Sequence, residues 1–251
     1  MKLTVLGCHG GELPDCRTTC FLVDGVMALD AGALCASLDL EALARVDHII
    51  LTHSHFDHVK DLPLLADLMV GRRERPVTVW ASRACVKTLQ KNVFNDALWP
   101  DFTRIPSAKN PVLELRSFKA GETFQAGEYE VTSVLVSHPV ESCGFVVRHG
   151  DTALGISGDT GPTDRLWEVL NATPNLKALL LETSFPSQLQ ALADLSGHLT
   201  PRTLRTELAK FQRNGSSVLL YHLKPAFVAE LKRELADLPV RVLELGDSFE
   251  L

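Results

Sequence analysis

An apolar run that ends in three histidines and an aspartate constrains this chain more than any other feature. Residues 45–52, RVDHIILT, form a short and nearly continuous apolar segment, which is typical of a strand buried on both faces. His53, His55, Asp57 and His58 follow it directly, so four imidazole or carboxylate groups occupy six positions. A solvated polar loop does not need this composition, and the cluster therefore favours a metal site.

The spacing within the cluster predicts two ions. Side chains at positions i and i+2 of an extended chain point to the same side, so His53 and His55 can bind a single ion. Asp57 and His58 lie at the turn into the next segment and can face a second ion. Imidazole and carboxylate ligands without thiolate suit zinc, manganese or iron. We therefore expect two divalent metal ions per chain, with zinc as the first choice.

Three more polar side chains follow apolar strands elsewhere in the chain. His138 ends the run in LVSHP, Asp159 follows the run in GISGDTGP, and His222 ends the run in LLYHLKP. If these strands run roughly together, the residues at their ends meet at one edge of the sheets, where loops on a rigid scaffold build concave sites. These three residues are therefore candidates to lie beside the histidine cluster.

The order of the predicted elements indicates an α/β protein with two sheets. Residues 18–32 predict a β-hairpin that turns at Asp24-Gly25, and residues 144–157 predict a second one that turns at His149-Gly150. An amphipathic helix is predicted over residues 201–213, between later strands. Hairpin-rich sheets with helices between them favour a two-sheet core that helices cover.

Composition and charge exclude several other classes of protein. The net charge is −6, which argues against binding to extended nucleic acid, and no apolar run approaches the ~18 residues that a membrane span requires. The six cysteines include no CxxC pair, and we expect reduced thiols in a cytoplasmic protein. We expect residues 1–251 to form a single domain, in which residues 71–110 are an excursion near the site that returns to the sheet.

The full set of motifs resembles the metallo-β-lactamase fold superfamily. Its members share H-x-H-x-D-H after a buried strand, then a strand-end histidine, an aspartate and a late histidine. The resemblance implies a four-layer αββα sandwich with mixed sheets, and a buried aspartate behind the site at Asp30. It also implies that Asp159 bridges two ions, one bound by His53, His55 and His138, and the other by Asp57, His58 and His222.

Two further stretches resemble the class II cyclic-nucleotide phosphodiesterases within this superfamily. They are NVFNDALWPDF and LLLETSFPSQLQALADLSGHLTPRTL, and the metal motif HSHFDHVKDLPLL also fits, with Phe56 where that family usually carries leucine. The commonest subclass of true β-lactamases has a cysteine at the position of Asp159, so antibiotic hydrolysis is a poor expectation. The resemblance implies hydrolysis of 3′,5′-cyclic nucleotides, cAMP or cGMP, to 5′-nucleoside monophosphates.

The resemblance also implies a catalytic pair outside the metal ligands. His198 would be the general acid that protonates the 3′ oxygen, and Glu182 would orient it. The predicted catalytic residues are therefore His198, Glu182 and the ligand Asp57. A helix-entry hydrogen bond with no catalytic part is the alternative for Glu182 and His198. Four aromatic residues could stack on a base or pack in the core: Phe94, Trp99, Phe102 and Phe185.

Two alternative functions stay open at this point. The first is a tRNase Z-like nuclease or a phosphodiesterase for another small cyclic phosphate, although the chain shows neither a long arm nor a basic balance. The second is a metal-stabilised binding protein that has lost catalysis, although all seven ligand positions are filled. We expect a small cyclic nucleotide as the partner, no extended nucleic acid and no membrane, and the sequence is compatible with a homodimer.

Overall fold

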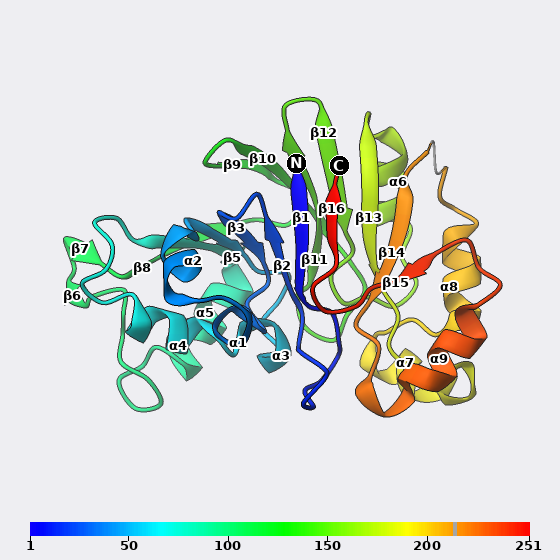
Figure 1. Cartoon of the computed structure of the whole chain (residues 1–251), viewed down its shortest axis with the longest axis horizontal. Helices are drawn as coiled ribbons and strands as arrows, with labels where there is room; N and C mark the ends of the chain where they lie inside the picture. The colour runs from blue at the N-terminus through cyan, green and yellow to red at the C-terminus, as the bar shows by residue number, and fades with distance from the viewer. Residues whose placement is uncertain (213–214) are drawn as a thin grey trace.

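Two seven-stranded sheets lie face to face in the computed structural model, which describes residues 1–212 and 215–251 (Figure 1). Both sheets mix parallel and antiparallel neighbours. In spatial order the first sheet contains β16 (Ser248–Glu250), β1 (Lys2–Gly7), β2 (Cys20–Val23), β3 (Met27–Leu29), β4 (His48–Ile50), β5 (Val77–Ser82) and β8 (Leu113–Phe118). The second contains β15 (Arg241–Val242), β14 (Ser217–Tyr221), β13 (Leu176–Glu182), β12 (Thr152–Ile156), β11 (Cys143–His149), β10 (Tyr129–Leu135) and β9 (Thr123–Ala126).

Helices cover the outer face of each sheet (Figure 1). No helix within the described residues is long and apolar enough to cross a membrane. The first sheet is flanked by α1 (Leu34–Ser37), α2 (Leu40–Arg45), α3 (Phe56–Val59), α4 (Leu62–Leu68) and α5 (Arg83–Asn92). The second is flanked by α6 (Arg165–Ala172), α7 (Gln190–Ser196), α8 (Pro201–Leu208) and α9 (Val228–Leu235).

Three separate clusters of buried apolar side chains match the three interfaces of a four-layer protein. The alternation of side chains along a strand explains how one strand serves two clusters. In β2, Phe21 and Val23 face the gap between the sheets, whereas Leu22 packs under the helices of the first sheet. In β13, Leu180 faces that same gap and Leu181 packs under the helices of the second sheet. The predicted αββα sandwich with mixed sheets is confirmed.

The two predicted hairpins form, and each turn differs from its prediction by one residue. In the first hairpin Val23 pairs with Met27, so the loop has three residues, Asp24 to Val26, and Asp24 and Gly25 adopt positive φ. This longer loop lets Met27 face the gap between the sheets. In the second hairpin His149 is still paired, with Thr152, and the turn residues are Gly150 and Asp151.

The predicted helix over residues 201–213 is shorter in the structure. Helix α8 covers Pro201–Leu208, and Thr200 caps it by accepting a hydrogen bond from the backbone N–H of Thr203. The turn that follows Leu208 keeps Phe211 buried, so the apolar stripe extends beyond the helix itself. The predicted end of the helix at residue 213 lies outside the described residues.

Residues 71–110 are built into the first sheet and its helical layer. Strand β5 lies between β4 and β8, and α5 follows it. Phe94 and Phe102 are buried in the core cluster under the first sheet, and Trp99 packs against that cluster, so these three aromatic rings serve core packing. The small β6–β7 sheet (Pro106–Ser107 and Asn110–Pro111) lies at the outer end of the molecule, away from α3 (Figure 1).

Burial makes most of the thiols unreactive, and this can be tested. All six cysteines are unpaired, and burial raises the pKa of Cys8, Cys85 and Cys143 to about 12. Cys16 and Cys35 are only partly buried. A thiol must ionise to react, so we predict that a disulfide reagent at pH 8 labels Cys16 first in the folded protein and all six cysteines in denaturant. The variant Cys16→Ser should lack the fastest step, and rapid labelling of all six native thiols would contradict the packing.

Candidate metal centre

The seven predicted ligands come from strand ends and loops of both sheets. The first sheet supplies the residues that follow β4, with Asp57 and His58 in the first turn of α3. The second sheet supplies the loop after β10 and the ends of β12 and β14. The chain therefore brings together His53, His55, Asp57, His58, His138, Asp159 and His222, in overlapping groups whose nitrogen and oxygen atoms lie within 4.8 Å of one another.

The carboxylate of Asp159 lies at the centre of the cluster. Its Oδ2 atom is 3.8 Å from His53 Nε2, and 3.2 Å from the Nε2 atoms of both His58 and His222. His222 Nε2 is also 3.2 Å from Asp57 Oδ2. One carboxylate oxygen thus reaches imidazoles from both halves of the ligand set, as a bridging position requires.

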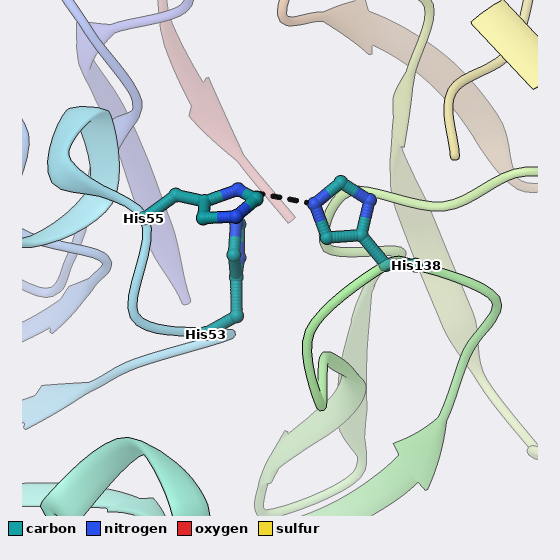
Figure 2. A group of neighbouring side chains, drawn as sticks. All are labelled: His53, His55 and His138. Atoms are coloured by element: carbon teal, nitrogen blue, oxygen red, sulfur yellow. Dashed lines mark hydrogen bonds between the residues drawn. The ribbon is translucent and has the colours of Figure 1, made fainter. Parts of the chain in front are cut away.

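The histidines divide into the two predicted groups. His53, His55 and His138 form one group, in which His55 Nδ1 is 3.1 Å from His138 Nε2 (Figure 2). Figure 2 shows the His55 and His138 rings pointing toward each other across the space between the two sheets' loops, with the His53 ring beside that of His55. Asp57, His58 and His222 form the other group. The arrangement is that of a dinuclear site, and the assignment of each residue as a ligand stays a prediction.

Three buried atoms of the cluster fit a bound cation. His53 Nε2, His58 Nε2 and Asp159 Oδ1 have no hydrogen-bond partner within the described part of the chain. An unpaired polar atom in a protein interior costs several kilocalories per mole unless it finds a partner, and a divalent cation provides one. Nitrogen and carboxylate oxygen donors suit zinc, manganese or iron. The buried histidine and aspartate cluster is therefore consistent with two metal ions.

Hydrogen bonds behind the cluster hold the rings in ligand orientation. Asp30 Oδ2 is 2.7 Å from His58 Nδ1, and Thr52 Oγ1 is 3.0 Å from His53 Nδ1. Asp30 also accepts a hydrogen bond from the backbone N–H of Thr52, at 2.8 Å. His138 donates from Nδ1 to the Gly197 carbonyl oxygen at 2.9 Å. Because the Nδ1 atoms of His53, His58 and His138 are engaged, their Nε2 atoms face the centre. Asp30 thus lies behind the site and not among the ligands.

Burial also favours the neutral, metal-binding form of three histidines. Burial lowers the pKa of His53, His55 and His138 below the usual value for histidine, because the charged form loses hydration. A neutral imidazole keeps the lone pair that a metal ion needs. The same physics that buries these rings therefore prepares them as ligands.

Glu182 and His198 lie beside the metal cluster and contact each other. Glu182 Oε1 is 3.0 Å from His198 Nδ1, and the Glu182 side chain is fully buried. The same oxygen accepts hydrogen bonds from the backbone N–H groups of Thr160 at 3.1 Å and Leu199 at 3.2 Å. Burial opposes a charge on His198, but the Glu182 carboxylate outweighs it and raises the pKa of His198. Glu182 therefore both stabilises the loop and favours a protonated His198.

Several residues that complete the site were not among those predicted from the sequence. Thr52 and Ser184 supply hydroxyl groups to the histidines, and Gly197 supplies a backbone carbonyl. Thr52 precedes His53 directly and Ser184 lies two positions after Glu182, so both were within motifs already recognised. Lys224, two residues after His222, places its ammonium group 5.9 Å from the Phe185 ring centre. That ring lies 5.8 Å from the ring of His198.

Removing the shared carboxylate should affect both ions. We predict that Asp159→Ala lowers the metal content of the purified protein from two ions toward none, because Asp159 lies between both histidine groups. The measurement is elemental analysis after dialysis against limiting zinc. His149→Ala is the matched control, since His149 ends β11 at the hairpin turn and belongs to no ligand group among residues 1–212 and 215–251. Two ions retained by Asp159→Ala would contradict the bridging position.

Comparison with known proteins agrees with this geometry. Residues 19–223 match the family model of the beta-lactamase superfamily domain. An uncharacterized protein of Mycobacterium leprae is 28% identical over 275 residues, which cover 100% of this chain and 89% of that protein. The 3′,5′-cyclic-nucleotide phosphodiesterase 1 of Saccharomyces cerevisiae is 26% identical over 259 residues, which cover 84% of this chain and 69% of that protein.

Solved structures share the same fold over the whole chain. Unliganded yeast PDE1 superimposes with a TM-score of 0.79 and 22% identity, covering 100% of this chain and 99% of the other. The short form of human tRNase Z superimposes with a TM-score of 0.73 and 16% identity, with the same coverage. At these identities the likeness shows the fold and does not choose between substrates. Since the family model spans most of its length, the chain belongs to the beta-lactamase superfamily, as a metal-dependent hydrolase with distant homology to class II cyclic-nucleotide phosphodiesterases.

Proposed function

We propose that this chain is a dinuclear metal-dependent phosphodiesterase that hydrolyses 3′,5′-cyclic nucleotides to 5′-nucleoside monophosphates. The observation that carries the proposal is the contact between Glu182 and His198 beside the metal cluster. Phosphodiester hydrolysis needs a proton donor for the leaving alkoxide, and metal ligands alone do not provide one. The distant homology to a yeast cyclic-nucleotide phosphodiesterase supports the same substrate class.

In this proposal His198 delivers a proton to the leaving oxygen. Its Nδ1–H donates to Glu182 Oε1, which leaves Nε2 as the atom that can hold the transferable proton. One ring nitrogen of His198 and one ligand atom each of His138 and Asp159 all lie within 4.8 Å of one another. The His198 ring therefore borders the predicted metal centre. Its raised pKa favours the protonated form that a general acid requires. When bound, the two ions would polarise the phosphodiester and make a water molecule nucleophilic.

Asp57 differs from the other carboxylate of the cluster in its exposure. Its side chain is 25% exposed, whereas that of Asp159 is 1% exposed. Solvent can therefore reach Asp57 and not Asp159. We assign Asp57 a second role beside that of ligand, which is to accept a hydrogen bond from the attacking water and orient it toward phosphorus.

An aromatic ring and a cation beside His198 fit a nucleotide. The Phe185 ring is half-buried and contacts the His198 ring, so its remaining face can stack on a base. Lys224 Nζ donates one hydrogen bond to the Gly10 carbonyl, at 2.8 Å, and forms no ion pair with a carboxylate in residues 1–212 or 215–251. Its remaining N–H groups can contact a phosphate oxygen. A small molecule that carries both a base and a phosphate can therefore contact Phe185 and Lys224 together.

A substrate panel tests the proposal directly. We predict that the protein loaded with zinc, or with manganese, hydrolyses cAMP or cGMP and releases the 5′-monophosphate, as measured by chromatography. A tRNA precursor and 2′,3′-cyclic AMP belong in the same panel, because tRNase Z shares the fold and the net charge of −6 opposes tRNA binding. Cleavage of the tRNA precursor without hydrolysis of cAMP or cGMP would overturn the proposal in favour of a nuclease.

The role of His198 depends on the leaving group. We predict that His198→Ala lowers kcat on cAMP by about 100-fold or more, because the 3′ alkoxide then leaves without a proton. The loss on bis(p-nitrophenyl) phosphate should be much smaller, since nitrophenolate needs no proton. Metal content, measured in parallel, should stay at two ions. His149→Ala serves as the control, and unchanged turnover of cAMP by His198→Ala would contradict an acid role.

A further inference from the structure

One buried hydroxyl joins the proposed general acid, its carboxylate and a predicted metal ligand. Ser184 Oγ lies 3.0 Å from Glu182 Oε2, 3.1 Å from His198 Nδ1 and 2.8 Å from His222 Nδ1. The Ser184 side chain is completely buried, so water does not compete for these contacts. The shortest of the three contacts is the one to His222.

The hydrogen atoms of this cluster can be assigned by counting donors and acceptors. A serine hydroxyl has one hydrogen to donate, and an ionised glutamate only accepts, so the Ser184 hydrogen points to Glu182 Oε2. His222 must keep Nε2 free of hydrogen to bind an ion, so its hydrogen is on Nδ1 and points to Ser184 Oγ. His198 donates from Nδ1 to Glu182 Oε1. A single carboxylate therefore fixes the tautomer of His198 directly and that of His222 through Ser184.

The backbone of Ser184 ties the same two loops together. Its N–H donates to the Leu199 carbonyl at 3.0 Å, next to His198. Its carbonyl accepts from the Lys224 N–H at 3.2 Å, two residues after His222. The loops that carry the acid and the metal ligand thus both attach to one residue, which makes their positions interdependent.

The His222 ring has little room to choose another acceptor. Its backbone adopts a positive φ of 69°, and its N–H donates to the Cys8 carbonyl at 2.7 Å. A Cβ atom placed on Gly10 would lie 2.7 Å from His222 Cε1, so the ring packs directly against the Gly10 backbone. Loss of the Ser184 hydroxyl would leave the Nδ1–H of His222 buried without an acceptor.

We propose that Ser184 is a positioning residue that couples ion binding at His222 to proton delivery by His198. The effect on ion binding is inferred from the Ser184–His222 contact alone. The effect on proton delivery by His198 rests on the proposed phosphodiesterase function. Through Ser184, Glu182 orients the ligand of the second ion and the general acid together. The second ion and the acid therefore reach their working positions as a unit.

Three variants test the coupling. Ser184→Ala removes the hydroxyl, Ser184→Thr keeps it, and Ser133→Ala is the matched control. Ser133 is similarly buried, and among the described residues its hydroxyl contacts backbone groups of Lys119, Gly121 and Glu122. For each variant, zinc titration of the metal-free protein gives the affinity of both ions, and thermal unfolding reports whether it folds. Turnover is measured at saturating zinc on cAMP and on bis(p-nitrophenyl) phosphate.

The proposal predicts a selective pattern. In Ser184→Ala one of the two zinc-binding steps should lose about 10- to 100-fold in affinity, the range usual for an outer hydrogen-bond partner, while the other step changes little. At saturating zinc, kcat should fall more on cAMP than on the nitrophenyl diester. Recovery of both properties in Ser184→Thr supports the role of the hydroxyl. Unchanged zinc affinity in Ser184→Ala, equal losses at both steps, or the same losses in Ser133→Ala would overturn it.

The metal titration separates this inference from the proposed function, because it uses no substrate. If neither the unaltered protein nor any variant hydrolyses a cyclic nucleotide, the proposed function fails. A selective loss of zinc affinity in Ser184→Ala would still support the role of Ser184 in positioning His222. If the unaltered protein is an active phosphodiesterase and Ser184→Ala matches it in zinc affinity and turnover, the inference about Ser184 fails alone.

Discussion

The burial of the Asp159 carboxylate among three imidazoles is the constraint on which the rest of the site depends. A buried, unpaired carboxylate is strongly unfavourable, and its Oδ2 atom lies within 3.8 Å of His53, His58 and His222. Those imidazoles come from loops that follow β4 and β14, on different sheets. The Asp159 carboxylate can be buried among these imidazoles only if both sheets end at the same place. Its burial therefore depends on how the two sheets pack against each other.

Parallel strands explain why so many functional side chains meet at one edge. β3, β4, β5 and β8 run parallel in the first sheet, and β12, β13, β14 and β15 run parallel in the second. Parallel neighbours present their carboxyl ends at a common edge, and loops at that edge carry side chains on a rigid base. The ends of β12, β13 and β14 thus place Asp159, Glu182 and His222 together.

The features that the sequence predicted correctly are local ones, and those that it did not predict depend on tertiary contacts. The strand-end positions of His53, Asp159 and His222 are visible because a polar side chain interrupts an apolar run. The first hairpin loop is one residue longer than predicted and the second turn lies one residue later, because pairing register depends on which face each side chain can bury. Ser184 and the Gly197 carbonyl were not found, since a serine or a backbone oxygen is common everywhere and only the folded loops bring it to a histidine.

The fold and the metal cluster leave the choice of substrate to other side chains. A similar fold accompanies a cyclic-nucleotide phosphodiesterase and a tRNase Z, so the shared architecture cannot by itself select a substrate. Selection has to come from side chains that reach past the ligands. Lys224 and Phe185 meet this condition, because they lie beside His198 and neither is needed to hold an ion. Phe56 meets it too, since it lies between His55 and Asp57 and is 72% exposed, which leaves its ring accessible beside the metal motif.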